Sequence, residues 1–275
     1  MAIDHAELRR TLVARVQHCA AQRPGVVVLG LSGAQGSGKS TLAHALAEGL
    51  AEARLPAAVL SLDDCYLTRA ERVDLAREVH PLFATRGVPG THDLSLVWQV
   101  IEALEAGRAA PLPRFDKAAD DRRARERWPI APAGTRVLIL EGWCLGAAPQ
   151  ANQALVAPIN ALERDEDPQG VWRRAVNHAL GGDYRRLFAR LDCVAMLAAP
   201  GFDVVEAWRW QQEVEHQNSA MDRAQLHRFV AHYERLTRAI LAEMPSRADV
   251  VAHLAEDRSI VSLTTRDHAG NETSR

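Results

Sequence analysis

The sequence has few cysteines and no long apolar run. Its four cysteines are scattered and form no CxxC pair, which argues against a zinc ribbon or a disulfide scaffold. No stretch approaches the ~18 to 20 consecutive apolar residues of a membrane span, and the first residues lack the apolar region of a secretory signal. We therefore expect a cytoplasmic protein with reduced thiols and no membrane partner.

The chain also has little excess charge. A net charge of -2 provides no overall basic field for nucleic acid, so we expect no nucleic-acid partner and infer that any anion site is local. The 275 residues, of which 47% are hydrophobic and 25% charged, are typical of a soluble globular protein. They suffice for one large domain with a sizeable core, and they leave the oligomeric state open.

Short apolar runs alternate with segments of helical periodicity along the chain. Parallel strands need crossovers, which helices provide, so this alternation predicts a mainly parallel sheet covered on both faces. We predict an α/β fold in three layers, with a five-stranded sheet and helical insertions. The predicted strands are residues 26–31, 57–62, 136–140, 191–198 and 249–254.

We predict a single domain over residues 1–265. Two segments, 80–130 and 146–189, are longer than plain crossovers, and we expect them to form walls of a substrate pocket. The polar end of the chain, residues 266–275, is expected to be a frayed tail.

A glycine-rich segment, GAQGSGKS at 33–40, follows the first predicted strand and opens a helix. It matches the spacing GxxxxGK[ST], in which glycines let backbone N–H groups curl around phosphate oxygens. Lys39 is expected to reach the β- and γ-phosphates of ATP and Ser40 to bind Mg²⁺, and the absence of an Asn-Lys-x-Asp tetrad argues against guanine. The alternative is a glycine-rich turn that binds nothing. The predicted nucleotide-binding residues are Gly33, Ala34, Gln35, Gly36, Ser37, Gly38, Lys39, Ser40 and Thr41.

Acidic residues follow two of the predicted strands. Asp63 and Asp64 come just after 57–62, and Glu141 comes just after 136–140, so all are expected at the carboxyl edge of the sheet. Phosphoryl transfer to an alcohol needs a carboxylate that accepts the hydroxyl proton, together with Mg²⁺. We predict Asp63 as this base and a metal set of Ser40, Asp63 and Glu141. The alternative for one aspartate, more readily Asp64, is a cap of the next helix.

Five segments in order carry a family resemblance. The phosphate loop, SLDDCYLT, RGVPGTHD, LPRFDKA and LEGWCLG resemble segments of the plant- and fungal-type D-glycerate 3-kinases and their bacterial relatives, within the superfamily of phosphoribulokinase, uridine kinase and pantothenate kinase. The resemblance extends from about residue 28 to 220. It implies a P-loop kinase that uses MgATP to phosphorylate a hydroxyl of D-glycerate. Cys65 and Cys144 replace larger apolar residues that are usual in this family, which leaves the size and shape of the acceptor open.

An acceptor that carries a carboxylate needs cations or hydrogen-bond donors as well as a base. Segment 80–130 supplies them, and Arg86 and Lys117 are the better candidates because the resemblance singles out their motifs. For His92 the alternative is that it caps or buttresses the following helix. The predicted substrate-binding residues are Asp64, Tyr66, Arg86, His92, Asp93, Lys117 and Trp143.

The segment after strand 191–198 reads as a helix that carries Arg209. In similar kinases this segment forms a lid, here expected at about residues 200–220, whose arginine reaches the ATP phosphates. The alternative is a pair between Arg209 and Glu213 on one helix face. The tryptophans at 208 and 210 cannot both face the core, so one is expected to cover the nucleotide or the substrate.

Together these features predict an ATP-dependent small-molecule kinase that transfers the γ-phosphoryl group of MgATP to a small hydroxy acid. The predicted catalytic residues are Lys39, Asp63, Glu141 and Arg209. A related kinase for a nucleoside, pantothenate or another sugar acid is an open alternative, although the few aromatics among the cations of 80–130 favour an acid. A nucleotide-gated regulatory ATPase is the alternative of a different class.

Overall fold

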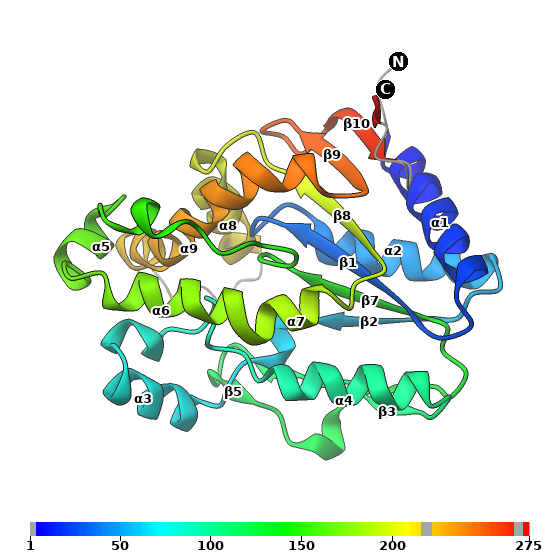
Figure 1. Ribbon diagram of the computed structural model, residues 1–275, viewed down its shortest axis with the longest axis horizontal. Helices are drawn as coiled ribbons and strands as arrows, with labels where there is room; N and C mark the ends of the chain where they lie inside the picture. Colours follow the sequence, from blue (N-terminus) through cyan, green and yellow to red (C-terminus); the bar gives the residue numbers. More distant parts are fainter. Residues whose placement is uncertain (1–3, 216–221, 267–271, 275) are drawn as a thin grey trace.

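The computed structural model describes residues 4–215, 222–266 and 272–274. A seven-stranded sheet with strand order β11-β10-β9-β8-β1-β7-β2 runs through it (Figure 1). β1 pairs in parallel with β7 and β8, and β2 and β9 extend the parallel part on either side. The strands are β1 (Val27–Gly33), β2 (Ala57–Ser61), β7 (Val137–Gly142), β8 (Cys193–Ala198), β9 (Val250–Leu254), β10 (Ile260–Arg266) and β11 (Glu272–Ser274).

The five predicted strands are confirmed as the parallel part of the sheet, but the predicted total of five is wrong. β10 pairs antiparallel with β9, and β11 pairs antiparallel with β10. β10 reads IVSLTTR and mixes polar with apolar residues, so it lacks the continuous apolar run that marks a central strand. The predicted frayed tail is wrong at Arg266 and Glu272–Ser274, which are paired, and its residues 267–271 and 275 lie outside the described residues.

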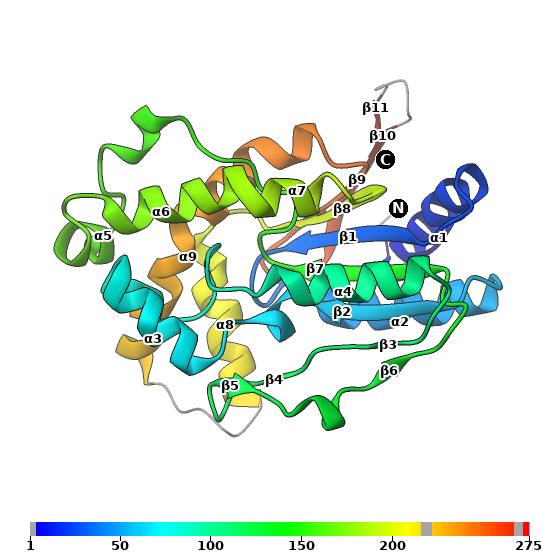
Figure 2. The same ribbon diagram turned by 60° about the horizontal axis from the view of Figure 1, so that its bottom comes forward.

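Helices cover both faces of the sheet, so the predicted three-layer α/β architecture is confirmed (Figures 1 and 2). Two short two-stranded ribbons, β4–β5 and β3–β6, lie in the predicted insertion 80–130, except that β6 extends one residue beyond it. The helices are α1 (His5–Gln22), α2 (Lys39–Glu52), α3 (Arg69–Glu78), α4 (Leu94–Glu105), α5 (Ala161–Glu166), α6 (Val171–Ala179), α7 (Arg185–Phe188), α8 (Asp203–Glu215) and α9 (Arg223–Glu243), and the short strands are β3 (Ala110–Pro111), β4 (Phe115–Asp116), β5 (Asp121–Arg122) and β6 (Ile130–Ala131).

Alternate residues of the central strand face two separate hydrophobic cores. Leu29 and Leu31 of β1 pack with buried side chains of α1, α2 and α8. Val28 packs on the other face with α4, α6 and α9. Every residue of β1 and β7 is buried, as expected of strands covered on both sides, whereas burial alternates along the edge strand β2. The two cores therefore fix the central strands from both faces and hold their carboxyl ends in place.

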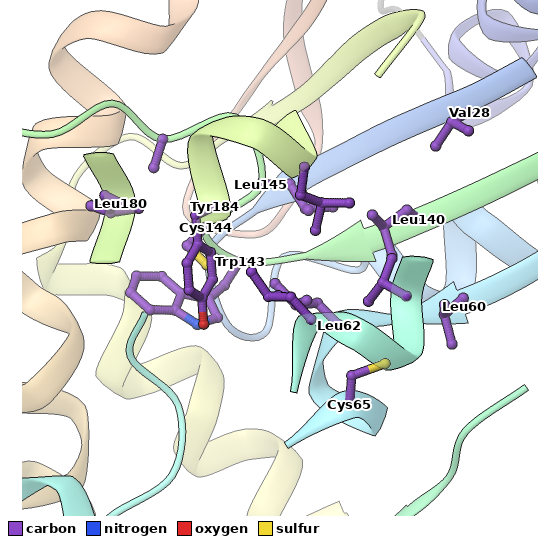
Figure 3. Close-up of a cluster of buried hydrophobic side chains, with 14 of the residues drawn as sticks. Val28, Leu60, Leu62, Cys65, Leu140, Trp143, Cys144, Leu145, Leu180 and Tyr184 are labelled. Atoms are coloured by element: carbon purple, nitrogen blue, oxygen red, sulfur yellow. The ribbon is translucent and has the colours of Figure 1, made fainter. Parts of the chain in front are cut away.

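The four cysteines are free and buried. Burial raises the pKa of the Cys65 and Cys144 thiols well above its ordinary value. Both side chains belong to the apolar cluster below the ends of β2 and β7 (Figure 3). Within the described ranges, no helix has the length and apolar character needed to cross a membrane.

A buried ion pair holds the loop between α5 and α6. The side chains of Arg173 and Asp167 are 2% and 1% exposed, with 3.1 Å between Nη1 and Oδ2. Arg173 also donates to the carbonyl oxygens of Leu155 (2.8 Å) and Val156 (3.1 Å), and Asp167 accepts from the backbone N–H of Trp172 (3.0 Å). These contacts satisfy two charges that would otherwise be buried without partners.

We expect Arg173→Met to lower the free energy of unfolding by about 3 to 5 kcal/mol, because it leaves the Asp167 carboxylate buried without its cation. Arg174→Met, at the exposed neighbouring position, should change it by less than about 0.5 kcal/mol. Urea denaturation of both variants measures the difference. A similar small loss in both would contradict this account of the ion pair.

Candidate active site

The glycine-rich segment forms the turn from β1 into α2 and lines a cavity of about 340 Å³. Gly36 and Gly38 have φ angles of +77° and +87°, a conformation that favours glycine. A Cβ at Gly36 would also come within 2.5 Å of the Trp208 Cβ. Because α2 begins at Lys39, its first backbone N–H groups and the positive end of its dipole lie at this turn. The residues present therefore fit a polyphosphate.

Glu141 lies at the end of β7 beside this turn. It is 4% exposed, and its Oε1 accepts a hydrogen bond from Ser40 Oγ at 2.9 Å. Its Oε2 is buried and has no hydrogen-bond partner among the described residues. A buried carboxylate oxygen beside a hydroxyl group is the oxygen chemistry that Mg²⁺ prefers, and Mg²⁺ takes its other ligands from phosphate and water. Ser40 and Glu141 thus fit this ion.

Asp63 lies in the short 3₁₀ helix Leu62–Cys65 that follows β2. Tyr66 Oη donates to its Oδ1 at 2.8 Å, and Lys117 Nζ donates to its Oδ2 at 3.1 Å. Burial works to raise the pKa of this carboxyl, but the charges of Lys117 and Lys39 and the Tyr66 hydrogen bond outweigh it, so the pKa lies well below its ordinary value. The carboxylate is ionised at neutral pH and faces the cavity.

Asp64 has the opposite environment. Burial raises its pKa, although the backbone N–H of Phe115 (3.0 Å) and the guanidinium of Arg114 (3.2 Å) act against this shift. Through these two contacts Asp64 links the 3₁₀ helix to the start of β4. The capping alternative is wrong for both aspartates, because Thr68 caps α3 and forms a capping box with Glu71. Two adjacent carboxyls with opposite pKa shifts are typical of sites where acids have different tasks.

Cations from three further segments line the same cavity. Arg86 precedes α4, Arg114 and Lys117 flank β4, and Arg209 comes from α8. Arg209 also lies 3.5 Å from the Gln212 side-chain oxygen. The side chain of Glu213, its alternative partner, lies outside the described residues, as do residues 216–221 at the end of the predicted lid. The described cavity lining thus carries five lysine and arginine side chains beside three carboxylates.

The β4–β5 ribbon that carries Lys117 is held by a charged cluster. Arg72 has a fully buried side chain that donates to Asp120 Oδ2 at 2.5 Å, and Arg86 donates to Oδ1 of the same carboxylate. Both guanidiniums lie 5.6 Å from the centre of the Phe115 ring. Asp120 has a φ of +53°, a conformation that the two arginines stabilise through its side chain. The cluster therefore anchors the ribbon on both sides of Lys117, at Phe115 and Asp120.

His92 lies outside the cavity lining, contrary to its predicted contact with substrate, and it packs against two tyrosines, whereas the alternative had it cap or buttress the following helix. It is 6% exposed, its ring stacks on Tyr66 at 4.6 Å, and its Nδ1 lies 2.6 Å from Tyr184 Oη. Burial lowers its pKa to about 4, against the smaller opposing effect of Asp63. His92 is therefore neutral at physiological pH and supports the ring whose hydroxyl binds Asp63.

Asp93 and Trp143 also lie outside the cavity lining, contrary to their predicted contact with substrate. Asp93 caps α4 by accepting from the Ser95 N–H (3.2 Å). Trp143 is 3% exposed and donates to the Gly87 carbonyl at 2.9 Å within the apolar cluster of Figure 3. Segment 146–189, predicted as a pocket wall, contributes no residue to the lining and packs farther out. The other predicted substrate residues, Asp64, Tyr66, Arg86 and Lys117, do line it.

Helix α9 supplies a part of the cavity wall that was not predicted from the sequence. Phe229 and Tyr233 line the cavity, and Tyr233 Oη donates to the Arg86 carbonyl at 3.1 Å. A Cβ at Gly87, whose φ is +134°, would lie 1.9 Å from that hydroxyl. His44, Val59, Ser61 and Gln212 complete the lining beside Arg114. Gly87 in the segment RGVPG is a sequence signal for a close approach to the backbone. The sequence alone does not show that the approaching side chain is Tyr233.

The comparisons with known proteins agree with this geometry. The model of the Phosphoribulokinase / Uridine kinase family matches residues 28–148. The kinase mug58 of Schizosaccharomyces pombe is 35% identical over 220 residues, which are 75% of this chain and 78% of that protein. The chain belongs to the phosphoribulokinase and uridine kinase family of P-loop kinases. It is a small-molecule kinase, and the family implies ATP as phosphoryl donor, normally with Mg²⁺.

Two further comparisons extend the similarity along the chain. The chloroplastic D-glycerate 3-kinase of Arabidopsis thaliana is 30% identical over 84% of this chain and 52% of that protein, so the chain spans about half of its length. The structure of a D-glycerate 3-kinase from Cryptococcus neoformans has a TM-score of 0.78 with 23% identity and covers 98% of this chain and 99% of that one. This second likeness shows that the fold is shared over nearly the whole chain.

We expect Gly87→Ala to lower the free energy of unfolding by about 2 to 5 kcal/mol, because the new methyl group meets Tyr233 and the backbone is strained. Gly107→Ala is the matched control, since φ there is +69° and nothing lies near the added Cβ. Its loss should be about 1 kcal/mol. Equal losses in urea titrations would show that the approach of Tyr233 is not what requires Gly87.

We expect Lys117→Met to raise the pKa of Asp63, because it removes the nearest cation that favours the carboxylate. The lowered pKa stabilises the fold above the unfolded-state pKa, and this stabilisation is lost as the pH falls through the native pKa, so the variant should lose it at higher pH. The measurement is the ¹³C carboxyl shift of Asp63 against pH. Arg123→Met, which removes a cation that pairs with Asp116 on the same ribbon, should leave the Asp63 titration unchanged.

Proposed function

We propose that this kinase phosphorylates a hydroxyl group of D-glycerate, or of a closely similar small hydroxy acid, with MgATP as donor. The observation that carries the proposal is the ionised Asp63, which lies between the phosphate-loop cation Lys39 and the acceptor-side cation Lys117. Such a cavity suits a substrate with a hydroxyl at one carbon and a carboxylate nearby. The identity with the plant D-glycerate 3-kinase supports the same acceptor.

Each residue has a definite task in this proposal. The phosphate-loop N–H groups and Lys39 bind the β- and γ-phosphates, and Ser40 with Glu141 would hold Mg²⁺, which when bound neutralises phosphate charge. We infer that Asp63 orients the acceptor hydroxyl and accepts its proton as the oxygen bonds to the γ-phosphorus. The bond from that phosphorus to the bridging oxygen of ADP breaks in the same step. The ammonium group of Lys117 lies 3.1 Å from Asp63 Oδ2 and would repel a metal cation there, so we assign Asp63 to the hydroxyl rather than to the metal.

The acceptor carboxylate is assigned to the cations opposite the phosphate loop. All three cations pair with an aspartate, but Arg86 and Arg114 are 15% and 31% exposed, whereas Lys117 is 58% exposed and pairs with the proposed base, Asp63. Lys117 is therefore the cation that an acceptor can most easily recruit. Arg209 enters from α8 on the phosphate side, where we propose that it stabilises charge on the transferred group.

The test is a screen of ADP release with D-glycerate, pantothenate, uridine and ribulose 5-phosphate as acceptors. We expect D-glycerate to give the largest stimulation, with one phosphorylated product for each ADP. Asp63→Asn should lower kcat by about 10² to 10⁴ while ATP affinity is retained, and Asp64→Asn should lower it far less. Full turnover in Asp63→Asn would refute the assigned base. Slow ATP hydrolysis that no acceptor stimulates would favour a regulatory ATPase instead.

A further inference from the structure

The tight turn between β9 and β10 contains an arginine in an unusual backbone conformation. Arg258 has a φ of +67°, and the non-glycine residues with positive φ in the described ranges are Arg54, Asp120 and Arg258. Glycine or asparagine adopts this conformation at lower cost, so a long side chain at such a position is stable only where its surroundings hold it. The side chain of Arg258 makes contacts of this kind.

The Arg258 guanidinium bridges the phosphate loop and helix α8. Its Nε donates to the Gly36 carbonyl oxygen at 2.6 Å, and its Nη1 donates to Gln211 Oε1 at 2.9 Å. The same group lies over the Trp208 ring, 5.2 Å from its centre. Residues 208 and 211 are one helical turn apart, so Arg258 contacts a single face of α8.

Trp208, on α8, in turn contacts both the β9–β10 turn and the phosphate loop. Its indole Nε1 donates to the Glu256 carbonyl in the β9–β10 turn at 2.7 Å, and its Cβ lies against Gly36, where no side chain fits. Trp208 is 3% exposed, so it is the buried one of the two tryptophans on this helix. Both views place α8 beside the loop at the end of β1 (Figures 1 and 2).

The neighbouring face of α8 lines the active-site cavity. Arg209 and Gln212 follow Trp208 and Gln211 by one residue each, and both line the cavity that contains Lys39 and Asp63. A rotation or a small shift of α8 would thus move Arg209 relative to the phosphate loop. The contacts of Arg258 and Trp208 oppose that movement, because they fix one face of the helix to the loop and to the turn.

We propose that Arg258 is a positioning residue, which holds α8 against the phosphate loop so that Arg209 faces the nucleotide phosphates. The inference rests on the proposed function, since it takes Arg209 as a contact to the transferred phosphate. Arg258 itself is absent from the cavity lining, so it acts through Gly36 and α8 rather than on substrate.

The test uses two arginines with the same backbone conformation. Arg258→Gly and Arg54→Gly each relieve a left-handed backbone, and Arg54 lies at the far end of α2, away from the cavity. We expect Arg258→Gly to weaken binding of the Mg²⁺ complex of the β,γ-imido analogue of ATP about fivefold and to lower kcat about tenfold. Arg54→Gly should match the wild type in both. A purely structural role would lower the melting temperature without this difference.

Arg209→Met supplies the second arm of the experiment. If Arg258 acts through Arg209, the double variant Arg209→Met/Arg258→Gly should bind the analogue no more weakly than Arg209→Met alone. The proposal is overturned if Arg258→Gly binds the analogue as the wild type does, or if the two losses multiply. Should the wild type transfer no phosphoryl group to D-glycerate, the proposed function fails, while calorimetry with the analogue still decides the role of Arg258.

Discussion

The parallel register of three strands is the constraint on which the active site depends. Leu31 of β1, Glu141 of β7 and Ser61 of β2 lie in one row across the sheet. Because parallel strands end at the same edge, the phosphate loop, the buried carboxylate and the 3₁₀ helix with Asp63 emerge side by side. The hydrogen bond from Ser40 to Glu141 then joins α2 to β7 across this row. The two hydrophobic cores on either face of the sheet keep the row in place.

The parts of the site that sequence predicted are those encoded locally. The phosphate loop has its own spacing, and Asp63 and Glu141 follow apolar runs whose direction is set by the parallel sheet, so their meeting could be expected before the structure was known. β10 and β11 could not be predicted in the same way, because they pair through an antiparallel hairpin with mixed polar residues. The strand pattern that identifies a buried parallel strand does not apply to such an edge.

The least predictable residues were those that reach the cavity from a distant segment of the sequence, or that support it without lining it. Nothing local to Phe229 or Tyr233 indicates that α9 reaches the cavity, because helix packing decides it. His92, Asp93 and Trp143 occur in motifs that carry the family resemblance, yet they support the site from behind. A motif indicates that a residue is needed for the local structure. It does not show whether the side chain contacts a ligand or orients a neighbouring side chain, because that depends on how the segments pack.

The ion pair between Lys117 and Asp63 affects which acceptor molecules the cavity can bind. Any alcohol that uses Asp63 as hydrogen-bond acceptor competes with the ammonium group for the same oxygens. A neutral polyol would weaken that ion pair without offering the ammonium another anion, whereas a hydroxy acid brings a carboxylate that can pair with it. Selectivity for anionic alcohols would then arise from an exchange of ion-pair partners at Lys117, in addition to any close fit around the bound molecule.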